Sequence, residues 1–243
     1  MQATIGSHCL ECAKEARPDI GTRAKFWSAS QPALVTLSLI AINAVVFVMT
    51  TVSDPGSLAG RATSLHARLA LWGPAVAAGE DYRLITYGFV HYGIIHIGFN
   101  MYLLYLLGQM LEPVIGRIRF ALVYLAGLLG GAAGALWLQP NALTAGASGA
   151  IFGLIALAFV GYWLHGTNPL STGIGTLLVL NLALTFFLSD RISVGGHIGG
   201  VVAGAICAFA VMSPGYKGVP NWVSYAVPIG VSALCAVIAL QVV

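Results

Sequence analysis

Charged residues are scarce in this chain. Asp, Glu, Lys and Arg make up 8% of its 243 residues, and hydrophobic residues make up 58%, whereas an ordinary soluble domain is about one quarter charged. So little charge excludes a large soluble domain and predicts an integral membrane protein. The eleven Lys and Arg leave a net charge of +3 and are dispersed, so no nucleic-acid partner is expected.

The sequence also lacks signs of export and of cross-linking. Its first 25 residues contain no apolar core before a small-residue cleavage site, so the first apolar segment is expected to act as a signal anchor. Of the four cysteines, Cys9 and Cys12 lie in a polar N-terminal tail, and Cys207 and Cys235 lie within apolar segments. A buried small side chain explains the latter two, and no disulfide is implied.

Apolar segments of about 20 residues, the length that crosses the hydrocarbon core, recur along the chain. They cover residues 32–52, 94–111, 118–138, 147–164, 172–188, 192–212 and 222–243. The pattern predicts an all-α polytopic membrane protein of seven helices, preceded by a polar tail over residues 1–31. Six spans are the alternative, if the last segment lies along the membrane surface.

The positively charged residues favour a cytoplasmic N-terminus, because Lys and Arg gather in cytoplasmic loops. With that orientation the inner side holds Lys14, Arg17, Arg23, Lys25, Arg117, Arg119 and Lys217, and the outer side holds Arg61, Arg68, Arg83 and Arg191. We expect a bacterial plasma membrane, since no organelle-targeting signal is seen.

Four polar side chains are predicted at one depth in the membrane. His96 and Asn100 fall in the first turns of the second span, Ser148 begins the fourth, and His197 lies near the start of the sixth. At 1.5 Å of rise per residue, all four lie within roughly 15 Å of the outer helix ends. Polar groups in hydrocarbon need partners or a wet cavity, so a water-containing site open to the outside is expected.

Ser148 and His197 are the candidate nucleophile and base of this site. Ser148 follows Gly146, precedes Gly149 and begins a helix, where unpaired N–H groups can stabilise an oxyanion. Glycines around His197 would let its helix approach that of Ser148 closely enough for a hydrogen bond. The simpler alternatives are an N-cap serine and a histidine that joins two helices.

A carboxylate for a catalytic triad is missing. The acidic residues after the tail are Asp54, Glu80, Asp81, Glu112 and Asp190. Because none lies in an apolar segment at the depth of the pair, the inventory permits a Ser–His dyad rather than a triad. His96 and Asn100, one helical turn apart, would donate to the oxyanion together with the Ser148 N–H, unless they are a structural pair that bonds neighbouring helices.

These residues carry a resemblance to the rhomboid family of intramembrane serine proteases. The motifs, in chain order, are His-x-x-x-Asn (His96, Asn100), Gly-x-Ser-Gly (Gly146, Ser148, Gly149) and Gly-His-x-x-Gly-x-x-x-Gly (Gly196, His197, Gly200, Gly204). Tyr82-Arg83 resembles the Trp-Arg pair of the family's first loop, and Gly108, Glu112 and Arg117 resemble its pattern after the second helix. His91 resembles an additional upstream histidine. One departure is Phe152, where many members have a tyrosine stacked on the histidine.

The resemblance implies a six-helix catalytic core over residues 32–212, with a loop and an additional helix over residues 213–243. It further implies an endopeptidase that cleaves membrane-anchored proteins, single-pass or multi-pass, near the outer end of a transmembrane segment. Membrane lipids are the other expected partners. Gly146, Gly149, Phe152, Gly196 and Gly200 would support the site.

No cofactor or metal is expected. His8-Cys9-x-x-Cys12 supplies at most three of the four ligands of a structural zinc site. Two rival functions stay open, a transporter or channel and a scaffold that binds membrane proteins. The absence of interrupted helices in matching halves disfavours the first, and a scaffold has no chemical need for the Ser–His pair.

Overall fold

The computed structural model describes residues 33–189, 192–213 and 219–243. Its long helices are α3 (Leu34–Ser53), α7 (Ile94–Ile115), α8 (Arg117–Leu138), α9 (Ser148–Leu164), α10 (Gly173–Phe187), α11 (Val194–Val211) and α12 (Val223–Gln241). Between them lie η1 (Pro55–Ala59), α4 (Ser64–Leu69), α5 (Gly73–Ala77), α6 (Arg83–Thr86), η2 (Tyr87–Phe89) and η3 (Pro169–Ser171). Since the described residues form helices and no strand, the predicted all-α fold is confirmed.

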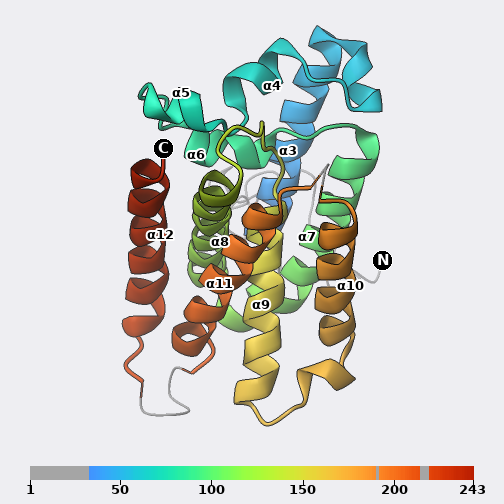
Figure 1. Cartoon of the computed structure of the whole chain (residues 1–243). Coiled ribbons are helices and arrows are strands. Elements are labelled where there is room, and N and C mark those ends of the chain that lie inside the picture. The colour runs from blue at the N-terminus through green and yellow to red at the C-terminus, as the bar shows by residue number, and fades with distance from the viewer. Residues whose placement is uncertain (1–32, 190–191, 214–218) are drawn as a thin grey trace, which may run out of the picture.

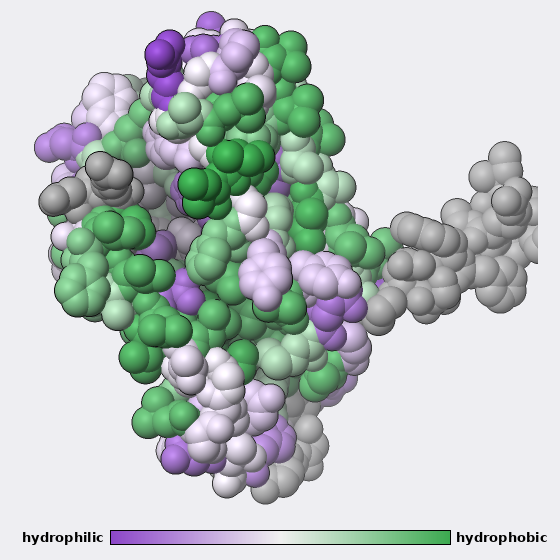
Figure 2. Space-filling view, turned by 90° about the vertical axis from the view of Figure 1, so that its right-hand side faces the viewer, coloured by the Kyte–Doolittle hydropathy of each residue, from purple (hydrophilic) through white to green (hydrophobic). Residues whose placement is uncertain are grey.

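Seven apolar helices match the seven predicted segments. Five of them, with 18 to 22 residues, are long and apolar enough to cross a membrane, and α9 and α10 are apolar but shorter, with 17 and 15 residues. Large apolar side chains face outward, and Figure 2 shows hydrophobic residues over much of the middle of one face, with hydrophilic residues gathered at both ends. The chain is an integral, multi-pass membrane protein.

One predicted boundary was wrong. The second span was expected to end at Leu111, but α7 continues through Pro113 to Ile115. A proline so close to the end of a helix removes little hydrogen bonding beyond its own missing N–H. The helix ends at Gly116, whose φ of 82° stops it and whose N–H donates to the Glu112 carbonyl.

The long helices alternate in direction, and the long connection that includes α4, α5 and α6 covers the end at which α7, α9 and α11 begin (Figure 1). The three central helices are α8, α9 and α11, which hold most of the residues that are buried in the seven long helices. Hence the starts of α9 and α11 meet in the interior beneath this connection.

The last helix, α12, runs alongside α8 rather than across the end of the bundle (Figure 1). Arg119 of α8 donates to the Ser224 hydroxyl at 2.7 Å and to the Asn221 side chain, and its guanidinium lies over the Tyr225 ring. This arrangement disagrees with the six-span alternative, in which the last segment would lie flat on the surface.

Helix α3 is held by a buried carboxylate. Glu112 of α7, 1% exposed, accepts hydrogen bonds from the Val35 N–H and the Thr36 N–H, both at 2.8 Å, and from the Thr36 hydroxyl at 2.7 Å. These N–H groups belong to the first turn of α3, which has no capping side chain of its own. Glu112 therefore caps α3 from another helix, at the positive end of the helix dipole.

Candidate active site

Ser148 and His197 are in direct contact inside the bundle. His197 Nε2 lies 2.8 Å from Ser148 Oγ. Ser148 is the first residue of α9, Ala147 occupies the N-cap position, and no side chain caps the helix. The hydroxyl is thus turned toward His197 and does not act as the N-cap group that the simpler alternative required. His197, the fourth residue of α11, is 8% exposed.

The second ring nitrogen of His197 meets a residue that the sequence analysis missed. His197 Nδ1 lies 2.7 Å from Thr185 Oγ1 of α10, and the same hydroxyl bonds to the Asn181 carbonyl at 2.7 Å. Among the described residues, the side-chain hydrogen-bond partners of His197 are therefore two hydroxyls and no carboxylate. The signal that could have found Thr185 is its spacing of four residues from Asn181 in an otherwise apolar helix, which places two polar side chains on one face.

Phe152 stacks on the imidazole of His197. The ring centroids are 4.1 Å apart and the planes meet at 27°. Phe152 lies one turn after Ser148 on α9, so the nucleophile and the stacking ring come from the same helix face. Stacking restricts rotation of the imidazole, and phenylalanine provides it without a hydroxyl contact.

His96 lies against the loop that precedes Ser148. A Cβ on Gly146 would come within 2.7 Å of His96 Nε2, and Gly146 has a φ of 125°, so both space and backbone conformation call for glycine here. His96 Nδ1 accepts the Tyr92 N–H at 3.3 Å. In a neutral imidazole, Nε2 then carries the proton and is a donor beside the serine loop.

Asn100 is buried one turn further along α7 and points back at its own helix. Its amide donates to the His96 carbonyl at 2.9 Å. One further N–H of the same amide remains as a donor. The structure thus brings His96 up to the Gly146 loop, whereas it gives no bond between Asn100 and Ser148.

His91 holds the serine loop from the side of the connection. Its Nε2 accepts the N–H of Ala147 at 3.3 Å, its carbonyl oxygen lies 3.0 Å from Nε2 of His66, and its ring meets that of His96 edge-on. Burial, with a smaller contribution from His96, lowers the pKa of His91 to about 3. The ring is therefore neutral at physiological pH, as its role as an acceptor requires.

Glycines let the central helices approach to backbone contact. A Cβ on Gly200 would overlap the Gly149 carbonyl oxygen, and a Cβ on Gly149 would meet Gly131 of α8 and the Gly196 carbonyl. The glycine pattern in the sequence predicted the close approach of α11 to α9, but not that of α8. On α8, four glycines face these two helices: Gly127, Gly130, Gly131 and Gly134.

The Tyr82-Arg83 pair anchors the connection above the site. Buried Arg83 donates to the carbonyls of Ala67 and Ala70 at 2.9 and 2.6 Å, and to Glu80 at 2.7 Å. Hydrogen bonds from Tyr82 and then Arg83 lower the pKa of Glu80 below its usual value. Both residues of the pair contact the connection and neither contacts Ser148 or His197.

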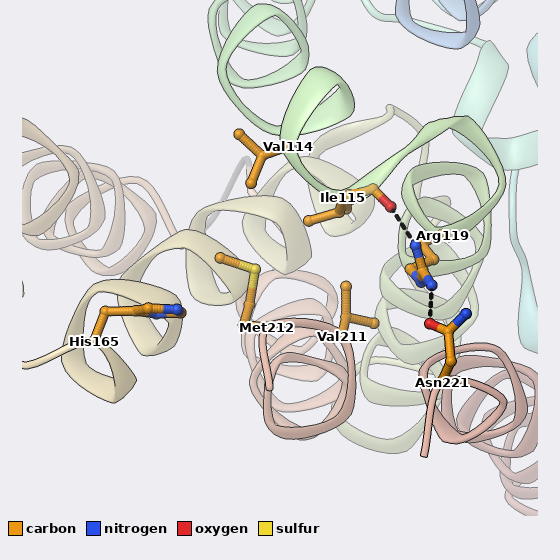
Figure 3. A pocket seen from close by; sticks show the side chains of 7 residues that line it. All are labelled: Val114, Ile115, Arg119, His165, Val211, Met212 and Asn221. Carbon is orange, nitrogen blue, oxygen red and sulfur yellow. Dashed lines mark hydrogen bonds between the residues drawn. The ribbon is translucent and has the colours of Figure 1, made fainter. Parts of the chain in front are cut away.

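A cavity of about 360 Å³ lies at the other end of the bundle (Figure 3). It is lined by Val114, Ile115, Arg119, His165, Val211, Met212 and Asn221. Arg119 bonds to the Ile115 carbonyl and to Asn221, across the junction with α12. No serine is among the residues that line this cavity, so it contains no pair of serine and histidine like that of Ser148 and His197.

The described part of the chain contains no group of three or more His, Cys, Asp or Glu that could hold a metal ion. His8, Cys9 and Cys12 lie outside the described residues.

Comparison with known proteins gives one family. A family model described as the rhomboid domain matches residues 78–214. The rhomboid protease GluP of Bacillus subtilis (strain 168) is 37% identical over 142 residues, which cover 57% of this chain and 28% of GluP. RHOMBOID-like protein 6, mitochondrial, of Arabidopsis thaliana is 32% identical over 151 residues, or 60% of this chain and 49% of that protein.

Rhomboid-type serine protease 2 of Emericella nidulans is 35% identical over 144 residues, which are 56% of this chain and 28% of that protein. These matches span between about a quarter and a half of the relatives' own lengths. The family model nevertheless covers 137 of the 243 residues, more than half. This chain belongs to the rhomboid family.

Proposed function

We propose that the chain is an intramembrane serine endopeptidase that cleaves transmembrane segments of membrane-anchored proteins with a Ser–His dyad. The observation that carries the proposal is the 2.8 Å contact between Ser148 Oγ and His197 Nε2 within a membrane-embedded bundle. The names of the related proteases support the same reaction class. A hydroxyl is a weak nucleophile until a base at hydrogen-bond distance takes its proton, and His197 is that base.

In the first half of the reaction, His197 Nε2 accepts the Ser148 proton as Oγ attacks the carbonyl carbon of the scissile peptide. The tetrahedral intermediate collapses when the imidazolium returns this proton to the leaving amine, which leaves an acyl-enzyme on Ser148. In the second half, His197 deprotonates a water molecule that hydrolyses the ester. Stacking on Phe152 keeps the ring in plane through both transfers.

The negative charge on the former carbonyl oxygen requires donors. The N–H of Ser148 is at the first position of α9 and so has no partner within the helix. His96 Nε2 lies beside the same loop, and the remaining amide N–H of Asn100 is one turn away. We assign the oxyanion site to these three groups, each of which is worth about 10²-fold or more in rate when it is well placed.

The position of the cut in the substrate follows from the depth of Ser148 and His197 in the bundle. Ser148 and His197 lie at the helix ends beneath the connection, so a substrate segment would be cut near one membrane face and only after local unwinding, since a helix hides its carbonyls. We assign this face to the outside, with the N-terminus in the cytoplasm. Residues 32–212 form the catalytic core in this proposal, and residues 213–243 add one helix to it.

The test is labelling of the detergent-purified protein with a hydrophobic fluorophosphonate, together with cleavage of a single-pass model substrate in liposomes. Wild type should react at one serine and cleave, while Ser148→Ala and His197→Ala should lose at least about 10³-fold in cleavage rate. Ser38→Ala is the matched control, because Ser38 is an exposed serine of α3 that bonds only to its own helix.

Equal labelling of wild type, Ser148→Ala and His197→Ala would contradict the proposal, as would a folded wild type that neither labels nor cleaves. Either outcome would favour the transporter or scaffold alternatives. Mass spectrometry of the cleaved substrate would place the cut, and a cut in the middle of the segment would contradict the assigned depth.

A further inference from the structure

Helix α10 turns a polar face toward the site. Asn181 and Thr185 are 8% and 1% exposed, whereas large apolar residues of the same helix, such as Leu180 and Phe187, are exposed at 57% and 86%. Neither polar residue belongs to a motif by which the site was recognised. The Thr185 hydroxyl of α10 therefore lies beside His197 of α11, which in turn contacts Ser148 of α9.

The hydrogen-bond directions around Thr185 are determined by its two partners. Its hydroxyl donates to the Asn181 carbonyl, one turn back in α10, because that oxygen can only accept. A hydroxyl has one proton, so toward His197 Nδ1, at 2.7 Å, Thr185 Oγ1 can only accept. His197 Nδ1 must therefore carry the proton.

The protonation of the other nitrogen follows. With the proton on Nδ1, neutral His197 has a lone pair on Nε2, and Nε2 faces Ser148 Oγ at 2.8 Å. In the opposite tautomer, Nε2–H would donate to Ser148 and could not take its proton. Only the Nδ1–H tautomer, which donates a hydrogen bond to Thr185, can act as a base toward Ser148.

We propose that Thr185 is a positioning residue that fixes the reactive tautomer of His197, in the place that a carboxylate occupies in a catalytic triad. The inference rests on the proposed protease function. Unlike a carboxylate, Thr185 brings no charge, so it selects the tautomer and the ring orientation without pairing with the imidazolium. Asn181 is the second residue in this arrangement, because its carbonyl accepts the only hydrogen bond that the Thr185 hydroxyl can donate.

The experiment compares Thr185→Val, which keeps the shape without the hydroxyl, with Thr185→Ser, which keeps the hydroxyl. We expect Thr185→Val to lower kcat by about 10- to 100-fold, the range for a buried donor left without its acceptor. KM should change little, since the substrate does not contact this group. Thr185→Ser should retain most of the wild-type kcat. Thr176→Val, at an exposed threonine of the same helix, is the matched control.

The independent readout is the tautomer itself, measured by solid-state ¹⁵N spectroscopy of histidine-labelled protein in liposomes, with the His197 signals identified by their loss in His197→Gln. Wild type should show Nδ1–H and unprotonated Nε2 at His197, and Thr185→Val should show a population of the opposite tautomer. This measurement needs no activity, so it separates failure of this inference from failure of the proposed function.

Nε2–H as the resting tautomer of wild type would overturn the inference, even if Thr185→Val did not fold. Equal losses of kcat in Thr185→Val and Thr185→Ser, with an unchanged tautomer, would also overturn it and would indicate a packing role. If wild type showed no Ser148-dependent cleavage while the tautomer was as expected, the proposed function would fail and the hydrogen-bond assignment would stand.

Discussion

Replacement of Glu112 by glutamine should loosen α3 from the rest of the bundle. The carboxylate accepts three hydrogen bonds, from the Val35 N–H, the Thr36 N–H and the Thr36 hydroxyl, at 2.7 to 2.8 Å. Glutamine is of the same shape but has one acceptor oxygen, and its NH₂ group would face a donor. The change therefore removes a charge at the start of a helix and leaves at least one buried donor unpaired.

The magnitude follows from these losses. A hydrogen bond to a charged group contributes about 1.5–3 kcal/mol, and a charge at a helix end contributes up to about 2 kcal/mol when partly buried. Because glutamine retains part of the bonding, we expect Glu112→Gln to lower the free energy of unfolding by about 2–4 kcal/mol. For a chain of this length that corresponds to a Tm lower by roughly 5–15 °C.

The assay is thermal or SDS-induced unfolding of the protein in mild detergent, with hydrogen exchange to locate the change. Exchange should rise first in the early turns of α3, while α8, α9 and α11 remain protected. Asp81→Asn, which makes the same chemical change at an exposed carboxylate of the connection, should have little effect. A Glu112→Gln protein with wild-type Tm and a protected α3 would refute the capping argument.

Two further outcomes are expected. Gly200→Ala should lower the free energy of unfolding by at least about 1–3 kcal/mol, because its Cβ would overlap the Gly149 carbonyl, and it should reduce cleavage by separating Ser148 from His197. Gly230→Ala is the control, since a Cβ there meets no other atom. Equal cleavage activity of the two variants would contradict the contact between Gly200 and Gly149. Since the pKa of His91 is lowered to about 3 from 6.5, the unfolded chain binds a proton below about pH 6.5 that the folded chain does not. The free energy of unfolding should thus fall by up to about 1.4 kcal/mol per pH unit as the pH is lowered from 6.5 toward 3. Unfolding in detergent at a series of pH values measures this slope. If His91→Gln showed the same slope, His91 would not be the cause of the pH dependence.

The spans and the pair of candidate catalytic residues could be predicted without coordinates. Hydrocarbon thickness sets the length of a membrane-spanning segment, so the apolar segments of the sequence located all seven helices to within a few residues. Ser148 and His197 stood out because a polar side chain in an apolar segment is costly and must have a partner. Their predicted depth depended only on helix rise and on the alternating direction of the spans.

What the sequence could not determine is which faces of the helices meet. The contacts of Thr185 with His197, of Glu112 with the start of α3, and of α8 with α9 and α11 depend on how each helix is rotated and offset relative to its neighbours. Within a lipid phase every apolar face is equally acceptable outside, so hydropathy indicates the rotation of a helix only where polar residues such as Asn181 and Thr185 mark one face. Sequence thus determined which residues lie at the depth of the site, and only tertiary packing decided that a threonine, rather than a carboxylate, lies against the second ring nitrogen of His197.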